Sequence, residues 1–136
     1  MADYYTAQKR SEIMRRVRAR SSRAELMVRQ LTHRMGYRYR LHRRDLPGRP
    51  DLVFAKSRKV IFVHGCFWHG HSCRSGQNRP KSNTAYWEPK LTRNMARDVE
   101  NLADLARMGW QALVVWECEL RDVEQIREKI KLFLSC

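Results

Sequence analysis

The stretch Lys59–Cys73, with the sequence KVIFVHGCFWHGHSC, constrains this chain more than any other. It begins with the apolar run Val60–Val63, which predicts a short buried strand. Three histidines, two cysteines and two adjacent aromatic residues lie at and beyond the end of that run, without helical or strand periodicity. Because α/β proteins usually place chemistry where a strand passes into a loop, we expect the functional site here.

The length and the cysteine content limit the class of protein. With 136 residues, 43% of them hydrophobic, the chain can form one domain around one core. We expect no membrane span, because no segment is long and apolar enough, and the N-terminus lacks a signal peptide's apolar segment. An intracellular location is therefore expected, where the four cysteines would bind metal or remain thiols rather than form two disulfides.

Positive charge is concentrated in the first third of the chain. The formal net charge is +14, and residues 1–49 carry 14 basic and 4 acidic residues, or +10 of that total. All but Lys9 of those 14 are arginine, whose planar guanidinium grips phosphate. This pattern indicates nucleic-acid binding, with a solvated basic surface as the alternative. We expect residues 1–20 to form a basic DNA-binding arm and residues 21–136 to form a single domain.

The first half of that domain is expected to hold one helix and three strands. Ser22-Arg-Ala-Glu25 fits a capping box that would open the helix, and Gly36 is a suitable stop. The strands are expected at Tyr37–Leu41, Asp51–Phe54 and Val60–Val63, with the last two forming an antiparallel hairpin.

The second half adds a helix, a strand and a final helix. Arg74–Thr84 is polar and is expected to be an exposed loop. Pro89 suits the first turn of a helix that runs to about Met108. A strand at Leu113–Trp116 and a helix at Val123–Leu134 complete the order α-β-β-β-α-β-α. The long crossover should make the last strand parallel to its partner, so the fold class is α/β, with a mixed sheet covered by helices.

Cysteine and histidine spacing predicts a zinc site. Cys66, His71 and Cys73 offer three ligands within one loop, and Cys118 follows a strand expected to lie beside it. Thiolate and imidazole suit Zn²⁺, and a closed site of four such ligands would be structural rather than catalytic. The alternative is two buried thiols and a surface imidazole.

Acidic and histidine side chains define a second candidate site. Asp51 precedes a strand paired with the one that ends near His64, where a carboxylate beside a free backbone carbonyl would suit Mg²⁺. Asp98 falls on the apolar stripe formed by Leu91, Met95, Leu102 and Leu105, and burial there would be costly without a partner. Either His64 or His69 could pair with it. The alternatives are that Asp51 is a turn residue and that Asp98 pairs with Arg97 or water.

Three segments carry a specific resemblance: Leu46–Asp51 (LPGRPD), Val60–His69 (VIFVHGCFWH) and Trp110–Cys118, with its terminal Trp-Glu-Cys. Over nearly its whole length the chain resembles the very-short-patch-repair (Vsr) DNA mismatch endonucleases. That resemblance implies a restriction-endonuclease-like fold. It also implies an enzyme that nicks the thymine strand of a T:G mismatch in double-stranded DNA, on the 5′ side of the thymine. Such mismatches arise when 5-methylcytosine deaminates. The alternatives are a zinc-stabilised DNA-binding module without catalysis and a sequence-specific restriction nuclease that acts on intact duplexes.

The resemblance also implies roles for individual residues. Asp51 and the backbone carbonyl of Val63 match the ligands of a catalytic Mg²⁺. His69 matches the catalytic histidine with Asp98 as its orienting partner, while His64 and Glu25 match active-site neighbours. Glu25 keeps its alternative role as the capping partner of Ser22. The matching structural zinc ligands are Cys66, His71, Cys73 and Cys118.

DNA contacts and cellular context complete the expectations. Three residues match the aromatic wedge that enters the DNA stack: Phe67, Trp68 and Trp87. The alternative for these three is packing against the sheet. The arginines expected to bind DNA are Arg15, Arg16, Arg18, Arg20 and Arg49. We expect a cytoplasmic, nucleoid-associated monomer that acts with mismatch-repair proteins.

Overall fold

The computed structural model describes residues 7–41, 43–66 and 84–135, and every structural statement below concerns those residues. Their elements, in chain order, are α1 (Ala7–Arg34), β1 (Arg40–Leu41), β2 (Leu52–Phe54), η1 (Ala55–Ser57), β3 (Lys59–His64), α3 (Thr84–Arg107), β4 (Gln111–Trp116), η2 (Glu117–Arg121) and α4 (Val123–Leu134). Apart from the short 3₁₀ turns η1 and η2, this is the predicted order. The predicted loop at 74–84 lies outside the described residues except for Thr84, which begins α3.

The four strands form one mixed sheet in the order β1-β2-β3-β4. β1 and β3 each run antiparallel to β2, whereas β4 runs parallel to β3. Arg58 closes the β2–β3 hairpin with a left-handed backbone (φ 53°). The predicted hairpin and the predicted parallel last strand are both confirmed. The strand predicted at Tyr37–Leu41 is shorter than expected, because only Arg40 and Leu41 pair with β2.

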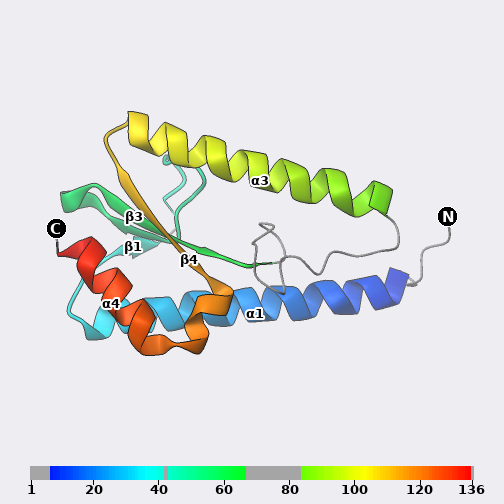
Figure 1. Ribbon diagram of the computed structural model, residues 1–136, viewed down its shortest axis with the longest axis horizontal. Helices are drawn as coiled ribbons and strands as arrows, with labels where there is room; N and C mark the ends of the chain where they lie inside the picture. The colour runs from blue at the N-terminus through cyan, green and yellow to red at the C-terminus, as the bar shows by residue number, and fades with distance from the viewer. Residues whose placement is uncertain (1–6, 42, 67–83, 136) are drawn as a thin grey trace.

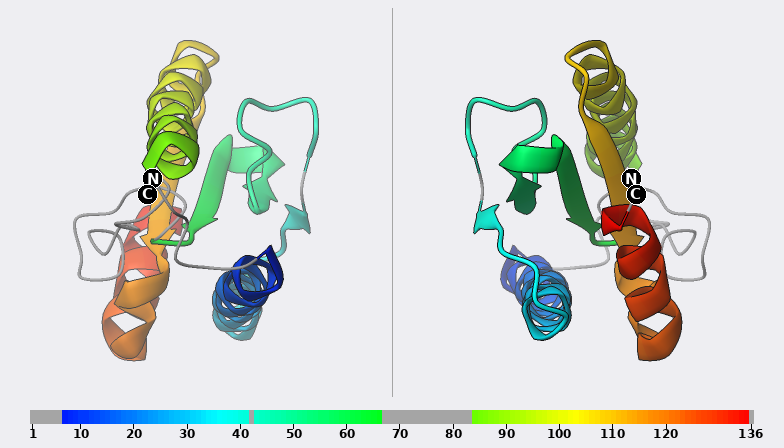
Figure 2. Two further views of the ribbon diagram at one scale, coloured as in Figure 1. Left: turned by 90° about the vertical axis from the view of Figure 1, so that its right-hand side faces the viewer. Right: turned by 90° about the vertical axis from the view of Figure 1, so that its left-hand side faces the viewer.

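Helices cover both faces of the sheet (Figure 1). On one face, residues of α1 and α4, among them Val28 and Ile130, pack with Ile61 of β3. On the other face, Leu105 of α3 packs against Val60 and Phe62 of β3. The end-on views in Figure 2 show α1 and α4 together on one side of the strands and α3 on the other. The fold is therefore a three-layer α/β arrangement, with β3 at the centre of both cores.

The first helix is longer than the sequence predicted. It begins at Ala7, so Ser22 lies inside it and the predicted capping box is wrong. Arginine is a good helix former, so the arginine-rich segment continues the helix rather than ending it. Ala24, Val28 and Leu31 are buried at spacings of four and three, and the Thr32 hydroxyl donates to the Val28 carbonyl at 2.8 Å. This buried stripe anchors the C-terminal half of α1 on the sheet.

The helix bounds after β3 are partly as predicted. α3 begins at Thr84, so Pro89 lies inside the helix rather than in its first turn. Leu91 and Leu105 are buried as the apolar stripe predicted, but Met95 is 37% exposed. The bounds of α4 are confirmed, and Oδ1 of Asp122 caps it by accepting from the Gln125 N–H at 3.2 Å. None of the helices in the described ranges is apolar enough over sufficient length to span a membrane.

Candidate active site

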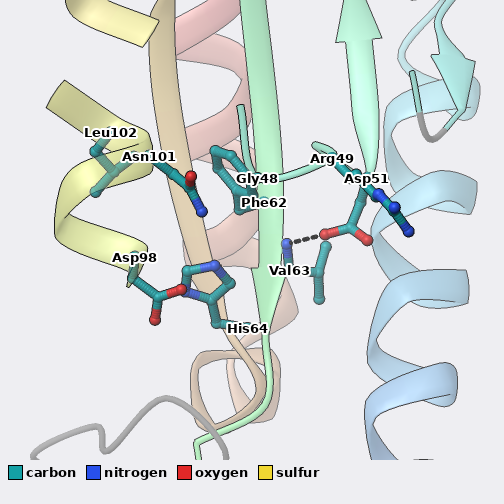
Figure 3. Close-up of a pocket in the computed structure, with 9 residues that line it drawn as sticks. All are labelled: Gly48, Arg49, Asp51, Phe62, Val63, His64, Asp98, Asn101 and Leu102. Carbon is teal, nitrogen blue, oxygen red and sulfur yellow. Dashed lines mark hydrogen bonds between the residues drawn. The ribbon is translucent and has the colours of Figure 1, made fainter. Parts of the chain in front are cut away.

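Asp51 and Val63 meet where β3 approaches its carboxyl end. The backbone N–H of Val63 donates to Oδ2 of Asp51, with 2.6 Å between the nitrogen and the oxygen (Figure 3). Asp51 immediately precedes β2. Its carboxylate accepts the Val63 N–H that the next residue pair of the β2–β3 ladder would otherwise have used. The contact fixes one carboxylate oxygen against the strand that the sequence identified as central.

The sheet register shows which ladder hydrogen bond to Val63 cannot form. Leu52 pairs with Ile61, and continuing that antiparallel register by two residues places Pro50 opposite Val63. Proline has no N–H, so it cannot donate to the Val63 carbonyl. In antiparallel pairing the N–H and C=O of one residue face the same neighbouring strand. The Val63 carbonyl therefore faces the side on which Asp51 lies.

A tight turn sets the approach to Asp51. The N–H of Arg49 donates to the carbonyl of Leu46 at 3.2 Å, and Gly48 has φ +77°. Proline at the second position and a positive-φ glycine at the third are the features of a type II turn, and Pro47 and Gly48 supply them. Leu46 is 4% exposed and Pro50 is buried, so both ends of the turn are anchored.

His64 and Asp98 face one another at the end of β3. The His64 side chain is 7% exposed and lies between two aromatic rings, with ring centroids 5.5 Å from Phe62 and 5.1 Å from Trp116. The Asp98 carboxylate, carried by α3, points toward the imidazole (Figure 3). Of the two histidines that the sequence offered as neighbours of Asp98, His64 lies beside it in the structure, and His69 lies outside the described residues.

These groups line one cavity of about 180 Å³. Asp51 and Val63 stand on one side of it and His64 and Asp98 on the other, while Gly48, Arg49 and Asn101 contribute further lining. Sequence reasoning missed Asn101. Its spacing of three residues from Asp98 places both side chains on the same helix face, but only the packing of α3 shows that this face lines the cavity.

The parallel pairing of β3 with β4 also places two cysteines just beyond the ends of adjacent strands. His64 pairs with Trp116 at the end of both strands, and Cys66 and Cys118 each follow two residues later in the chain. Cys66 is 1% exposed, Cys118 is half-buried, and neither forms a disulfide. Beyond Trp116 the chain enters η2, where Oε1 of Glu119 accepts from the Trp116 N–H at 2.8 Å. Cys66 and Cys118 therefore follow the ends of two adjacent parallel strands, and the zinc site that they would share stays a prediction.

The structure describes only part of each predicted metal site. His69, His71 and Cys73 lie outside the described residues, as do the predicted wedge residues Phe67 and Trp68. Within the described ranges, no three His, Cys, Asp or Glu side chains gather closely enough to hold a metal ion. The oxygen donors at Asp51 and Val63 suit a hard cation, and the two thiols suit Zn²⁺.

The remaining predicted residues lie on α1 or on its neighbours. Glu25 does not cap the helix; its Oε1 lies 2.6 Å from Nη2 of Arg29, and it is not among the cavity-lining residues. Arg15 is exposed on α1, and Arg49 is exposed at the cavity, with a left-handed backbone (φ 48°). The side chains of Arg16, Arg18, Arg20 and Trp87 lie outside the described part of the structure.

An ion pair precedes the turn that leads to Asp51. Arg43 donates to both carboxylate oxygens of Asp45, at 2.9 and 2.5 Å, and stacks 5.7 Å from the Trp110 ring centroid. The side-chain hydrogen bond is the main cause that lowers the pKa of Asp45 and raises that of Arg43. Both groups are solvent-exposed, so the pair orders the loop more than it stabilises the fold.

Comparison with known proteins places this geometry in context. The model of the family described as "DNA mismatch endonuclease Vsr" matches residues 2–75. Type II nicking enzyme V.XorIIP of Xanthomonas oryzae pv. oryzae is 50% identical over 135 residues, which cover 99% of this chain and 98% of that relative. Type II nicking enzyme V.NmeAIP of Neisseria meningitidis is 42% identical, over 96% of this chain and 92% of the relative. DNA mismatch endonuclease Vsr of Escherichia coli is 38% identical, over 95% and 82%.

Proposed function

Because this chain belongs to the Vsr family of DNA endonucleases, we propose that it nicks the thymine-containing strand of a T:G mismatch, on the 5′ side of the thymine. Such a nick would start very short patch repair of deaminated 5-methylcytosine. We further propose that its mixed four-stranded sheet is a restriction-endonuclease-like core. A nuclease needs charge stabilisation at the scissile phosphate and a group that handles the proton of the attacking water.

The observation that carries the proposal is the cavity, which is lined by oxygen ligands suited to a metal ion and by an imidazole and a carboxylate suited to proton transfer. Asp51 and the Val63 carbonyl supply oxygen ligands of the kind that Mg²⁺ accepts. Magnesium at that position would supply Lewis-acid stabilisation of phosphate charge. Across the cavity, His64 and Asp98 provide an imidazole and a carboxylate that face one another. The proposed reaction would use both groups on one phosphate, the metal for charge and the imidazole for the proton.

Proton transfer is assigned to the histidines. His69 would take the proton of the attacking water or orient that water, with Asp98 fixing its ring. His64, held between Phe62 and Trp116, adds a second imidazole beside the same carboxylate. Glu25 would act as a neighbour of the site from α1. The arginine-rich N-terminal third would bind the phosphate backbone without reading the mismatch.

A structural zinc would support the loop that follows β3. Cys66 and Cys118 would supply two thiolates of a tetrahedral thiolate–imidazole site, and His71 and Cys73 are the proposed remaining ligands. Phe67 and Trp68 lie next to Cys66 in the chain, so the zinc would brace these two wedge residues. Trp87 is the third proposed member of the wedge. A monomer acting on double-stranded DNA in the cytoplasm, together with mismatch-repair proteins, completes the proposal.

A second candidate function is strand nicking within a fixed sequence on intact duplexes. It is favoured because several relatives are named type II nicking enzymes. Two duplexes that differ only in one T:G or T:A pair distinguish the candidates. Mismatch specificity predicts nicking of the T:G duplex alone, whereas equal nicking of both would support the second candidate.

A further inference from the structure

The two sides of the cavity are formed by separate structural elements. Asp51 follows the turn that begins at Leu46, whereas Asp98 is carried by α3 on the opposite side of the cavity. Their separation therefore depends on how the turn packs against the helix. Asn101, one helical turn beyond Asp98, lies where these two elements meet (Figure 3).

The contact between the turn and the helix is close. A Cβ added to Gly48 would lie 3.0 Å from Nδ2 of Asn101, 3.2 Å from its Cβ and 3.0 Å from Cε1 of Phe62. These distances are tighter than most contacts that real Cβ atoms make, so a methyl group at Gly48 would require Asn101 and Phe62 to move by a few tenths of an ångström. The positive φ of Gly48 adds a second reason why another residue fits poorly there.

We propose that Asn101 is a positioning residue that sets the separation between Asp51 and the His64–Asp98 side of the cavity. It would do so by packing its side chain against Gly48, three residues before Asp51, while its own helix carries Asp98. The proposal rests on the function proposed above, because the separation matters only if metal and proton chemistry act on one phosphate. Displacing reacting groups by about 1 Å can lower a rate by about 100-fold.

The chemistry of the side chain fits this role. Leu102 and Leu105, the next residues of α3 toward the core, pack into the apolar cluster beneath the turn. Asn101 is half-buried at the edge of that cluster, in the wall of a cavity lined by two carboxylates. The amide is neutral, so it adds no charge beside Asp51 or Asp98, and its NH2 and carbonyl groups can still form hydrogen bonds in a polar cavity wall.

A thermal double-mutant cycle tests the contact without requiring activity. Gly48→Ala should lower the Tm strongly, and Asn101→Ala should recover part of that loss by making space for the new methyl group. In the parent background Asn101→Ala should lower the Tm slightly. Losses that simply add in the double variant would show that the two residues do not pack as proposed and would overturn the inference, even if the protein nicks T:G DNA as expected.

A magnesium titration tests the consequence for the site. Asn101→Ala should raise the Mg²⁺ concentration that gives half-maximal nicking by roughly 10-fold, as changes behind a metal ligand commonly do. Val99→Ala, on a 70% exposed position of the same helix, is the matched control and should leave it unchanged. A purely structural role would lower the Tm without moving this midpoint, and that result would overturn the inference.

Failure of the positioning role of Asn101 can be distinguished from failure of the proposed nicking function. If Gly48→Ala does not fold, the magnesium midpoint of Asn101→Ala decides the inference alone. If the parent protein nicks no T:G duplex, the proposed function fails. In that case the Mg²⁺-dependent rise in Tm of the DNA-free protein replaces the nicking midpoint, because ligand binding to the folded state raises Tm according to its affinity. An unchanged Mg²⁺ dependence in Asn101→Ala would overturn the inference in either case.

Discussion

The backbone N–H of Val63 donates to Oδ2 of Asp51 across 2.6 Å, at the position where Pro50 cannot continue the β2–β3 ladder. A carboxylate thus ends the pairing of two strands, and the Val63 carbonyl faces the same side. This arrangement makes Asp51 the residue whose loss should separate catalysis from DNA binding.

Asp51→Ala is expected to lower the nicking rate by roughly 1,000-fold or more, since several kcal/mol of charge stabilisation would be lost with the metal. Affinity for a T:G duplex should be largely retained, because in the proposed function the arginines would supply the phosphate contacts. Single-turnover nicking and electrophoretic mobility shifts measure the two quantities. Asp45→Asn, which removes an exposed carboxylate paired with Arg43, is the control and should affect neither strongly. Equal losses of rate and affinity in Asp51→Ala would contradict the assignment.

Asp98 and His69 are expected to act as one unit. The double variant His69→Ala/Asp98→Ala should nick little more slowly than the slower single variant, because removing either residue already disables the unit. Single-turnover rates of the four proteins provide the measurement. His64→Ala should be combined with Asp98→Ala in a second cycle, since those two side chains face one another. Losses that multiply in both cycles would make Asp98 an independent structural residue.

Zinc removal is expected to destabilise the whole fold rather than one loop. Cys66 and Cys118 follow adjacent parallel strands, so a metal bound by both would tie β3 to β4. Cys118→Ser should lower both zinc content and Tm, while Cys136→Ser should change neither. Metal analysis and calorimetry provide the readouts. Less than one zinc per intact parent chain, or a normal zinc content in Cys118→Ser, would be incompatible with the proposed site.

Trp68 is expected to act in finding the mismatch. An aromatic wedge unstacks base pairs at a cost of a few kcal/mol per step, and the cost is lowest where pairing is already faulty. Trp68→Ala, folded and zinc-loaded, should therefore lose more activity on T:G duplex than general DNA affinity. Fluorescence of 2-aminopurine beside the mismatch should rise when the parent protein binds and rise less with the variant. Unchanged fluorescence and an unchanged mismatch preference would instead assign Trp68 to core packing.

Elements with strong local signals were predictable from sequence. The apolar run Val60–Val63 became the centre of β3, and the bounds of α4 were read directly from its amphipathic pattern. Predicted helix starts were less reliable. Ser22 resembles a cap, but the helix continues through it because the preceding arginines favour helix. At α3, Pro89 suited a first turn, yet the helix begins five residues earlier.

The site was predictable where strand pairing alone determines proximity. Asp51 and Val63 belong to hairpin partners, so the sequence could place them together. Cys66 and Cys118 follow two strands whose parallel pairing was also predictable, and their shared zinc site stays a prediction. The partner of Asp98 remained open from the sequence. Helix periodicity shows which residues share one face of a helix, but not which part of the fold that face contacts. Asn101 was missed for the same reason: its contact with Gly48 depends on the docking of α3 against a turn more than 50 residues earlier.

Strand-resolved nicking measures the central claim most directly. A duplex with one T:G mismatch, labelled on either strand, should be cut only on the thymine strand and only 5′ of the thymine, with Mg²⁺ present and not with EDTA. The matched T:A duplex should remain intact under the same conditions. Cleavage of both strands, equal cutting of the T:A duplex or full activity in EDTA would contradict a Mg²⁺-dependent mismatch-nicking endonuclease.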